Sequence, residues 1–345
     1  MTSDRDSNRQ VPDTAHSADD ERLDALADIA LKWLARNASC FEPPLETDQV
    51  AFDPESVQPC SSRKAFGELG LALAIRAKSD PKRHHSSKSV EEESALKTRW
   101  LAWAEKKQIF FDLERRIHLF PLTLVNAWSL RQFGALPPDI PLRAQTLFDL
   151  GFIEHSETSL WAKVDLAHYA DGLGLKHKFP APEKVISQSS LPDPPSLVHM
   201  TRFDAYGLTH ILFHLTSFGR EDIQKEVRFL GELETYLRIA FLIYLEERDY
   251  DLCLELLAAL ICLRRDIDGL LEMVLDVIEP LVRREGYVPG RKAVDPGHGL
   301  EGQPLFLEVY HPTLVLLILE ALYRMHHEPP TTLRTELATV GGALA

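Results

Sequence analysis

Hydrophobic residues recur at three- and four-residue intervals along most of the chain, which is the spacing of one face of an α-helix. The pattern starts after Asp20 and is already regular through Leu34. It also predicts helices over 64–77, 90–118, 122–133, 142–152, 160–172, 205–218, 221–247, 252–264, 269–284 and 313–325. We find no convincing series of alternating apolar and polar positions that would indicate β-strands. We therefore expect an all-α protein.

Polar and proline-rich segments divide this helical pattern. The predicted divisions are a disordered tail at 1–20, a helical part at 21–178, a connection at 179–200, a second helical part at 201–328 that carries the candidate site, and a tail at 329–345. The connection contains five prolines, which favours either an extended linker between domains or a long crossover on one domain. Residues 286–304 contain five glycines and three prolines and are a candidate lid.

Three apolar segments resemble one another and indicate an internal repeat. They include Thr123, Thr209 and Thr313, and the separations of 86 and 104 residues each accommodate about two helical hairpins of a ~40–47-residue repeat. The helices that carry Thr209 and Thr313 are apolar on nearly every side, as expected of helices surrounded by neighbours. The sequence thus predicts stacked helical hairpins, either as an open solenoid or as an α/α toroid. We favour the toroid, because the polar capping repeats of an open array are not evident.

Composition and charge exclude several classes of function. The 38 Lys and Arg residues against 52 Asp and Glu give a net charge of −14, which opposes nucleic-acid binding. The four cysteines lack CxxC spacing and fit a reducing cytoplasm. The N-terminus has no apolar signal-peptide core, and no segment offers the roughly 18 uninterrupted apolar residues of a membrane span. We expect an acidic cytoplasmic protein with neither nucleic-acid nor membrane partners, in an oligomeric state that the sequence leaves open.

Two histidines of one predicted helix are the first candidates for chemistry. His210 and His214 are four residues apart and share a helix face, with Tyr206 one turn earlier. Two imidazoles on one face supply half of a zinc or iron site if another helix adds a ligand, for which His311 and Asp204 are candidates.

Other interpretations of this helix remain open. An imidazole has an ordinary pKa near physiological pH, so His210 can serve as a general acid or base without any cofactor, which is our leading expectation. The histidines can also be packing residues. Asp204 then serves only as the N-cap of a helix that starts at Ala205.

A second candidate group follows the glycine-rich segment. Tyr310, His311 and Thr313 cluster at a predicted helix start, where side chains and free backbone amides can face a ligand together. In the alternative interpretation, Pro312 takes the first helical turn and Tyr310 only packs.

A third group lies on the helix predicted over 160–172. It contains Asp165, His168 and Tyr169, for which we expect capping and surface solvation rather than chemistry. Other signatures are absent from the sequence, since it contains neither the GxxxxGK[ST] phosphate loop nor the GxSxG nucleophile elbow.

Two segments together resemble an uncharacterised family of helical bacterial proteins, mainly from actinomycetes, often encoded near specialised-metabolite genes. In that family the first segment tends to read Asp-x-Tyr-x-Leu-Thr-His-x-x-Phe-Tyr-x-Thr-Asp-Phe-Gly and the second Tyr-His-x-Thr. The matching residues are Asp204, Tyr206, Leu208, Thr209, His210, Phe213, Phe218, Gly219, Tyr310, His311 and Thr313. The resemblance covers mainly the C-terminal 145 residues, implies no settled activity, and draws attention to Asp204, His210 and His311. The chain departs from the family at His214, usually an aromatic residue, and at Ser217, usually an acid.

These observations lead to a functional hypothesis and two alternatives. We expect an enzyme of specialised metabolism whose helical cavity holds a small or carrier-tethered substrate for cyclisation, isomerisation, elimination or hydrolysis. Asp204 would orient His210, His210 would move a proton, and Tyr310 with His311 would polarise the reacting group. The expected substrate contacts are Tyr206, Thr209 and Thr313. The alternatives are a non-catalytic helical-repeat scaffold and a zinc or iron enzyme with His210, His214 and His311 as ligands.

Overall fold

The computed structural model describes residues 18–44, 57–79, 86–111, 113–223, 228–295, 297 and 299–327. Within these ranges every regular element is a helix, which confirms the all-α prediction. The α-helices are α1 (Ala18–Arg36), α2 (Val57–Arg76), α3 (Ser87–Lys106), α4 (Phe120–Gln132), α5 (Ile140–Asp149), α6 (Leu160–Leu173), α7 (Pro182–Gln188), α8 (Arg202–Leu215), α9 (Leu230–Glu246), α10 (Tyr250–Cys262), α11 (Asp268–Glu285) and α12 (Gly302–His327). Of the predicted tails, 1–17 and 329–345 lie outside the described residues, and 18–20 belong to α1.

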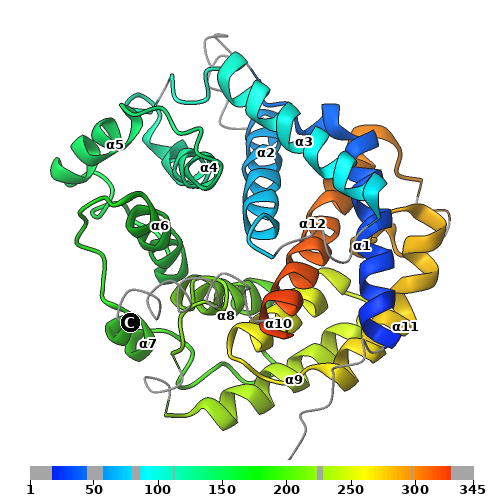
Figure 1. The fold of residues 1–345 in the computed structure, drawn as a ribbon. Coiled ribbons are helices and arrows are strands. Elements are labelled where there is room, and N and C mark those ends of the chain that lie inside the picture. The colour runs from blue at the N-terminus through cyan, green and yellow to red at the C-terminus, as the bar shows by residue number, and fades with distance from the viewer. Residues whose placement is uncertain are drawn as a thin grey trace, which may run out of the picture.

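The even-numbered helices pack in a cyclic order. Each of α2, α4, α6, α8, α10 and α12 contacts the next, and α12 also contacts α2. Figure 1 shows these helices around a common centre, with α1, α3, α5, α9 and α11 outside them. This position explains the apolar character of the inner helices: α10 is buried at every residue from Tyr250 to Cys262, so it has no solvent-facing side that would need polar residues.

Several predicted helix bounds are wrong, most clearly in α12. The helix predicted over 90–118 ends at Lys106, and the one predicted over 221–247 starts at Leu230. Helix α12 starts at Gly302 and continues through Pro312, so Tyr310 and His311 lie inside a helix and not at its start. Pro312 has no N–H to donate to the carbonyl of Glu308. That carbonyl instead lies against Gly290, where a Cβ atom would be only 2.2 Å from the oxygen.

The described part of the predicted lid is packed against the body of the protein. Tyr287 and Val288 are buried, and the Val288 N–H donates to Oγ1 of Thr313 at 3.1 Å. The Thr313 hydroxyl in turn donates to the carbonyl of Val309. Thr313 therefore anchors this segment to α12, and positions 296 and 298 lie outside the described residues.

The proline-rich connection is also folded onto the body of the protein. It contains the short helix α7, whose Val185 and Ile186 are buried, and Leu191 beyond it is completely buried. The Tyr236 hydroxyl of α9 donates to the carbonyl of Pro195 at 2.6 Å. These contacts distinguish the connection from a free linker.

Helix α12 is long and apolar enough to cross a membrane, the one such helix among the described residues. However, 72% of its most apolar window is buried inside the molecule. Packing inside the protein therefore accounts for the apolar composition of α12.

Candidate functional site

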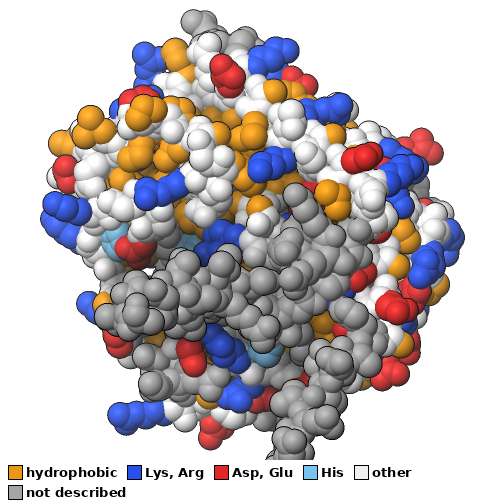
Figure 2. All heavy atoms as spheres, in the orientation of Figure 1, with side chains coloured by type: hydrophobic (Ala, Val, Ile, Leu, Met, Phe, Trp, Pro, Cys, Tyr) orange, Lys and Arg blue, Asp and Glu red, His pale blue; other side chains and the backbone are white. Residues whose placement is uncertain are grey.

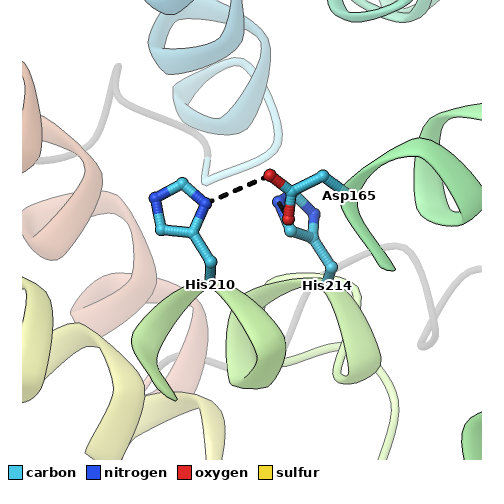
Figure 3. A group of neighbouring side chains, drawn as sticks. All are labelled: Asp165, His210 and His214. Carbon is cyan, nitrogen blue, oxygen red and sulfur yellow. Dashed lines mark hydrogen bonds and ion pairs between the residues drawn. The ribbon is translucent and has the colours of Figure 1, made fainter. Parts of the chain in front are cut away.

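Asp165 of α6 lies between two histidines of α8. Its Oδ2 is 3.2 Å from Nδ1 of His210, and its Oδ1 is 3.0 Å from Nε2 of His214. Figure 3 shows the two imidazoles rising from successive turns of α8 toward this one carboxylate. The side chain of His210 is 29% exposed and that of His214 only 3%. We call Asp165, His210 and His214 the Asp165 cluster.

The charges within the Asp165 cluster support one another. Burial raises the pKa of Asp165, but His214 and His210 lower it by more, so the carboxyl group is held ionised. Burial lowers the pKa of His210, yet the adjacent Asp165 more than offsets this effect and the pKa lies above its ordinary value. His168, one turn beyond Asp165, has a pKa well below its usual range because of burial and the proximity of His214. It is therefore a neutral imidazole.

A second polar group surrounds His311 of α12. Nε2 of His311 lies 3.3 Å from Oε1 of Glu255 and 3.6 Å from Oδ1 of Asp251, both on α10. Nδ1 lies 3.4 Å from Oε2 of Glu68 on α2. The His311 side chain remains 24% exposed. We call Glu68, Asp251, Glu255 and His311 the His311 cluster.

The carboxylates of this cluster hold His311 in its charged form. Burial lowers the pKa of His311, but Asp251 and Glu68 raise it well above its ordinary value. In return, His311 and Lys64 overcome the effect of burial on Glu68 and lower its pKa to about 2. Burial raises the pKa of Asp251, whereas Glu255, although equally buried, has a lowered pKa because His311 donates a hydrogen bond to it.

Hydroxyl groups from two inner helices complete the His311 cluster. They donate to its carboxylates: Tyr206 to Asp251 at 2.5 Å, Thr209 to Glu255 at 2.5 Å, and Tyr310 to Glu68. Burial and these carboxylates raise the pKa of Tyr206 and Tyr310, so both phenols stay protonated. Because Thr209 and His210 are consecutive on α8, the two clusters are neighbours. The charge of His311 accordingly acts on the pKa of His210.

A cavity of about 900 Å³ lies next to the Asp165 cluster, and both His214 and His168 line it. Basic side chains also line the cavity, among them Lys78, whose ammonium lies 4.5 Å from the ring centroid of Trp128. Burial and the charge of Arg220 lower the pKa of Lys78 to about 8. In Figure 2, histidine and basic side chains are visible together on the surface below a hydrophobic area. A small molecule therefore has room beside His214.

A family model described as a domain of unknown function, DUF6895, matches residues 27–321. The chain belongs to the DUF6895 family. The match contains every residue of both clusters, from Glu68 to His311. No curated protein and no solved structure matches the chain.

Asp204 lies outside both clusters of this DUF6895 domain, contrary to the predicted pairing with His210. Its Oδ2 accepts hydrogen bonds from the backbone N–H and the hydroxyl of Thr201, at 2.9 and 2.6 Å, and its own N–H donates to the Thr201 hydroxyl. Helix α8 starts at Arg202, so Thr201 is the N-cap and Asp204 is the third helical residue of a capping box. The carboxylate that contacts His210 is Asp165.

The predicted metal ligands fall into different groups. His210 and His214 share Asp165, whereas His311 lies with Asp251 and Glu255. Among the described residues, these are the two sets of three histidine or acidic side chains whose ligand atoms all lie within 4.8 Å of one another. The predicted set of three histidines is therefore not the one that the fold assembles. Thr313, a predicted substrate contact, has the structural role in α12 given above.

The sequence patterns did not identify the four carboxylates of the two clusters as site residues. Asp165 was interpreted as a capping or surface residue, and Glu68, Asp251 and Glu255 were not singled out. A usable signal was present in α10, where Asp251 and Glu255 are four residues apart and the residues between and after them are apolar. Two acids on one face of a helix with no exposed side must have partners inside the protein.

Proposed function

We propose that this DUF6895 protein is an enzyme that uses His311 for acid–base chemistry on a small or carrier-tethered substrate. The observation that carries the proposal is the concentration of three histidines and four carboxylates on the inner, even-numbered helices. They come from α2, α6, α8, α10 and α12. Buried charges are costly to desolvate, and strongly shifted pKa values of this kind gather at functional sites.

We also propose that the even-numbered helices form the inner wall of an α/α toroid. The cyclic order of contacts among the even-numbered helices supports this arrangement. A toroid brings residues from distant parts of the chain to a shared hollow, which a small substrate can enter. The partial exposure of His210 and His311 is consistent with such access.

In this proposal His311 transfers the proton. Its raised pKa keeps it protonated at neutral pH, so it can donate to a leaving group or to a developing anion. The surrounding carboxylates of Glu68, Asp251 and Glu255 then favour recovery of the proton. We assign this role to His311 in place of His210, because carboxylates from two helices surround His311, whereas His210 contacts a single carboxylate. Isomerisation, elimination, cyclisation and hydrolysis all use such a step.

The cellular setting follows from composition and from the resemblance. We propose that the protein acts in the cytoplasm of a bacterium, in specialised metabolism, without nucleic-acid or membrane partners. The acidic composition and the free Cys40, Cys253 and Cys262 support this setting.

The test compares metabolite conversion by matched histidine variants. Purified wild-type protein is incubated with a metabolite extract of a strain that lacks the gene, and mass spectrometry follows which compounds disappear. We expect conversion by wild type and by His155→Asn, a control at an exposed histidine, and at least a ~100-fold slower reaction with His311→Gln. Circular dichroism checks that each variant is folded.

Two results would contradict the proposal. If folded His311→Gln converts the same compound at the wild-type rate, His311 does not transfer the proton. If wild type changes no metabolite, the enzyme hypothesis gives way to a non-catalytic scaffold.

A further inference from the structure

We infer that the Asp165 cluster binds one divalent transition-metal ion, with Asp165, His210 and His214 as the protein ligands. This set differs from the one expected from sequence, because Asp165 replaces His311. The use of the ion in catalysis rests on the proposed function. Its binding does not, and can be measured without a substrate.

The spacing of the ligand atoms fits an ion. Ligands at ~2.1 Å from a metal lie ~3.0 Å apart at right angles and ~3.4 Å apart in a tetrahedron. The two contacts of Asp165 use different oxygens, Oδ2 at 3.2 Å from His210 and Oδ1 at 3.0 Å from His214, and each distance is in this range. Ligand atoms from all three residues lie within 4.8 Å of one another. Two ligand atoms of one ion are at most ~4.2 Å apart. Small rotations of the imidazole rings are therefore enough to bring all three ligand atoms within bonding distance of one ion.

Hydrogen bonding accounts for only one contact of the cluster, the one between His210 and Oδ2 of Asp165. Oδ1 of Asp165 is buried and, despite its 3.0 Å approach to His214, makes no hydrogen bond of acceptable geometry. Nδ1 of His214 is likewise buried without a hydrogen-bond partner. A close approach of an oxygen and a nitrogen without a well-aligned proton between them is what two ligands of one cation show.

The chemistry of the ligands selects the class of ion. Imidazole nitrogens favour zinc, iron and similar ions, whereas magnesium and calcium favour oxygen. Two histidines and one carboxylate leave coordination positions open for water or substrate. The ring of His214 is also held in place by aromatic neighbours, with ring centroids 5.2 Å from Tyr169 and 5.3 Å from Phe218.

The His311 cluster is the weaker of the two candidates. It offers one imidazole against three carboxylates, and each carboxylate already accepts a hydrogen bond from a hydroxyl group. The ion and the proton donor are therefore assigned to neighbouring but separate groups.

An ion at the Asp165 cluster would lie beside the cavity. His214 lines the cavity. An ion at this cluster would therefore be able to polarise a carbonyl oxygen of a molecule in the cavity, or to activate a water molecule for attack on it.

The experiment titrates chelator-treated protein with zinc, with ferrous iron under anaerobic conditions, and with magnesium, by calorimetry. We expect about one equivalent of zinc or iron to bind and magnesium not to bind. Asp165→Asn, His210→Asn and His214→Phe should each weaken binding by about 100-fold or more, since loss of a ligand exceeds the effect of an outer-shell change. His214→Phe preserves the aromatic packing, and circular dichroism checks the fold of each variant.

Matched controls decide between the two clusters. His155→Asn should bind the ion as wild type does, and His311→Gln should still bind about one equivalent. The inference is overturned if no transition metal binds stoichiometrically, or if Asp165→Asn binds it unchanged. It is also overturned if binding is lost in His311→Gln but kept in Asp165→Asn, which places the ion at the other cluster. Absence of metal together with slow conversion by His311→Gln would refute only this inference and leave the proposed function standing.

Discussion

Removing the charge of Arg76 tests whether the contact between α2 and α12 holds the cycle of inner helices together. Arg76 is the last residue of α2, and its fully buried guanidinium contacts Glu320 of α12 and Glu93 of α3. Since α2 and α12 are the first and last of the even-numbered helices, this ion pair lies where the cycle closes. Arg76→Met keeps an unbranched side chain and removes the charge.

The structure sets the expected loss of stability. Removing one partner of a buried ion pair costs ~3–5 kcal/mol, because the other charge stays in a medium of low dielectric constant. Glu320 is only 2% exposed, but it retains Arg324, whose Nε lies 3.6 Å away. Glu93 is 13% exposed, so its charge is accessible to solvent. We therefore expect Arg76→Met to lower the free energy of unfolding by about 3 kcal/mol, the lower end of this range.

Urea denaturation followed by circular dichroism measures this change from the midpoint and the slope. The double variant Arg76→Met/Glu320→Met provides the control, because replacing both charges with apolar groups of similar volume is often neutral or stabilising. Its stability should lie within about 1 kcal/mol of wild type. With the single variant Glu320→Met measured as well, the double-mutant cycle should give a coupling energy of about 2 kcal/mol or more between the two sites. A single variant as stable as wild type, or additive effects in the double variant, would show that the buried pair does not hold these helices together.

Two further variants test the site itself. The folded-state pKa of His311 is raised, so its interactions stabilise the fold fully below the unfolded pKa of ~6.5 and are lost as the pH rises through the raised value. The charged and titratable groups facing it are Glu68 and Lys64 from α2, His210 from α8, Asp251 and Glu255 from α10, and Tyr310 from its own helix. Urea midpoints of wild type and His311→Gln should differ more at about pH 6 than at about pH 10; a constant difference would contradict the assigned charge. Asp204→Ala removes half of the capping box and should lower the free energy of unfolding, measured by urea denaturation, by about 1 kcal/mol while metabolite conversion persists. Loss of conversion in a variant that remains folded would show that Asp204 takes part in the reaction.

Helix content was predictable because burial imposes a period on the sequence, whereas helix ends depend on local geometry. Apolar spacing located α4, α6 and α10 to within two residues at each end. It failed at α12, where Pro312 suggested a helix start. The helix tolerates this proline because Gly290 leaves room for the carbonyl of Glu308, a contact between residues 18 positions apart that periodicity does not contain.

The candidate site was predictable only where a single helix carries the signal. His210 with His214, and Tyr310 with His311, each lie on one helix, and the structure places all four in polar groups. The error was in pairing them across helices: Asp204 is closer in sequence to His210, but the fold turns it toward Thr201 and brings Asp165 from α6 instead. A carboxylate on a neighbouring inner helix is selected by the packing of α6 against α8, so no spacing rule within one segment could identify it. The same dependence makes the two clusters sensitive to how the inner helices pack, and ties any chemistry at His311 to the closed cycle of contacts that Arg76 supports.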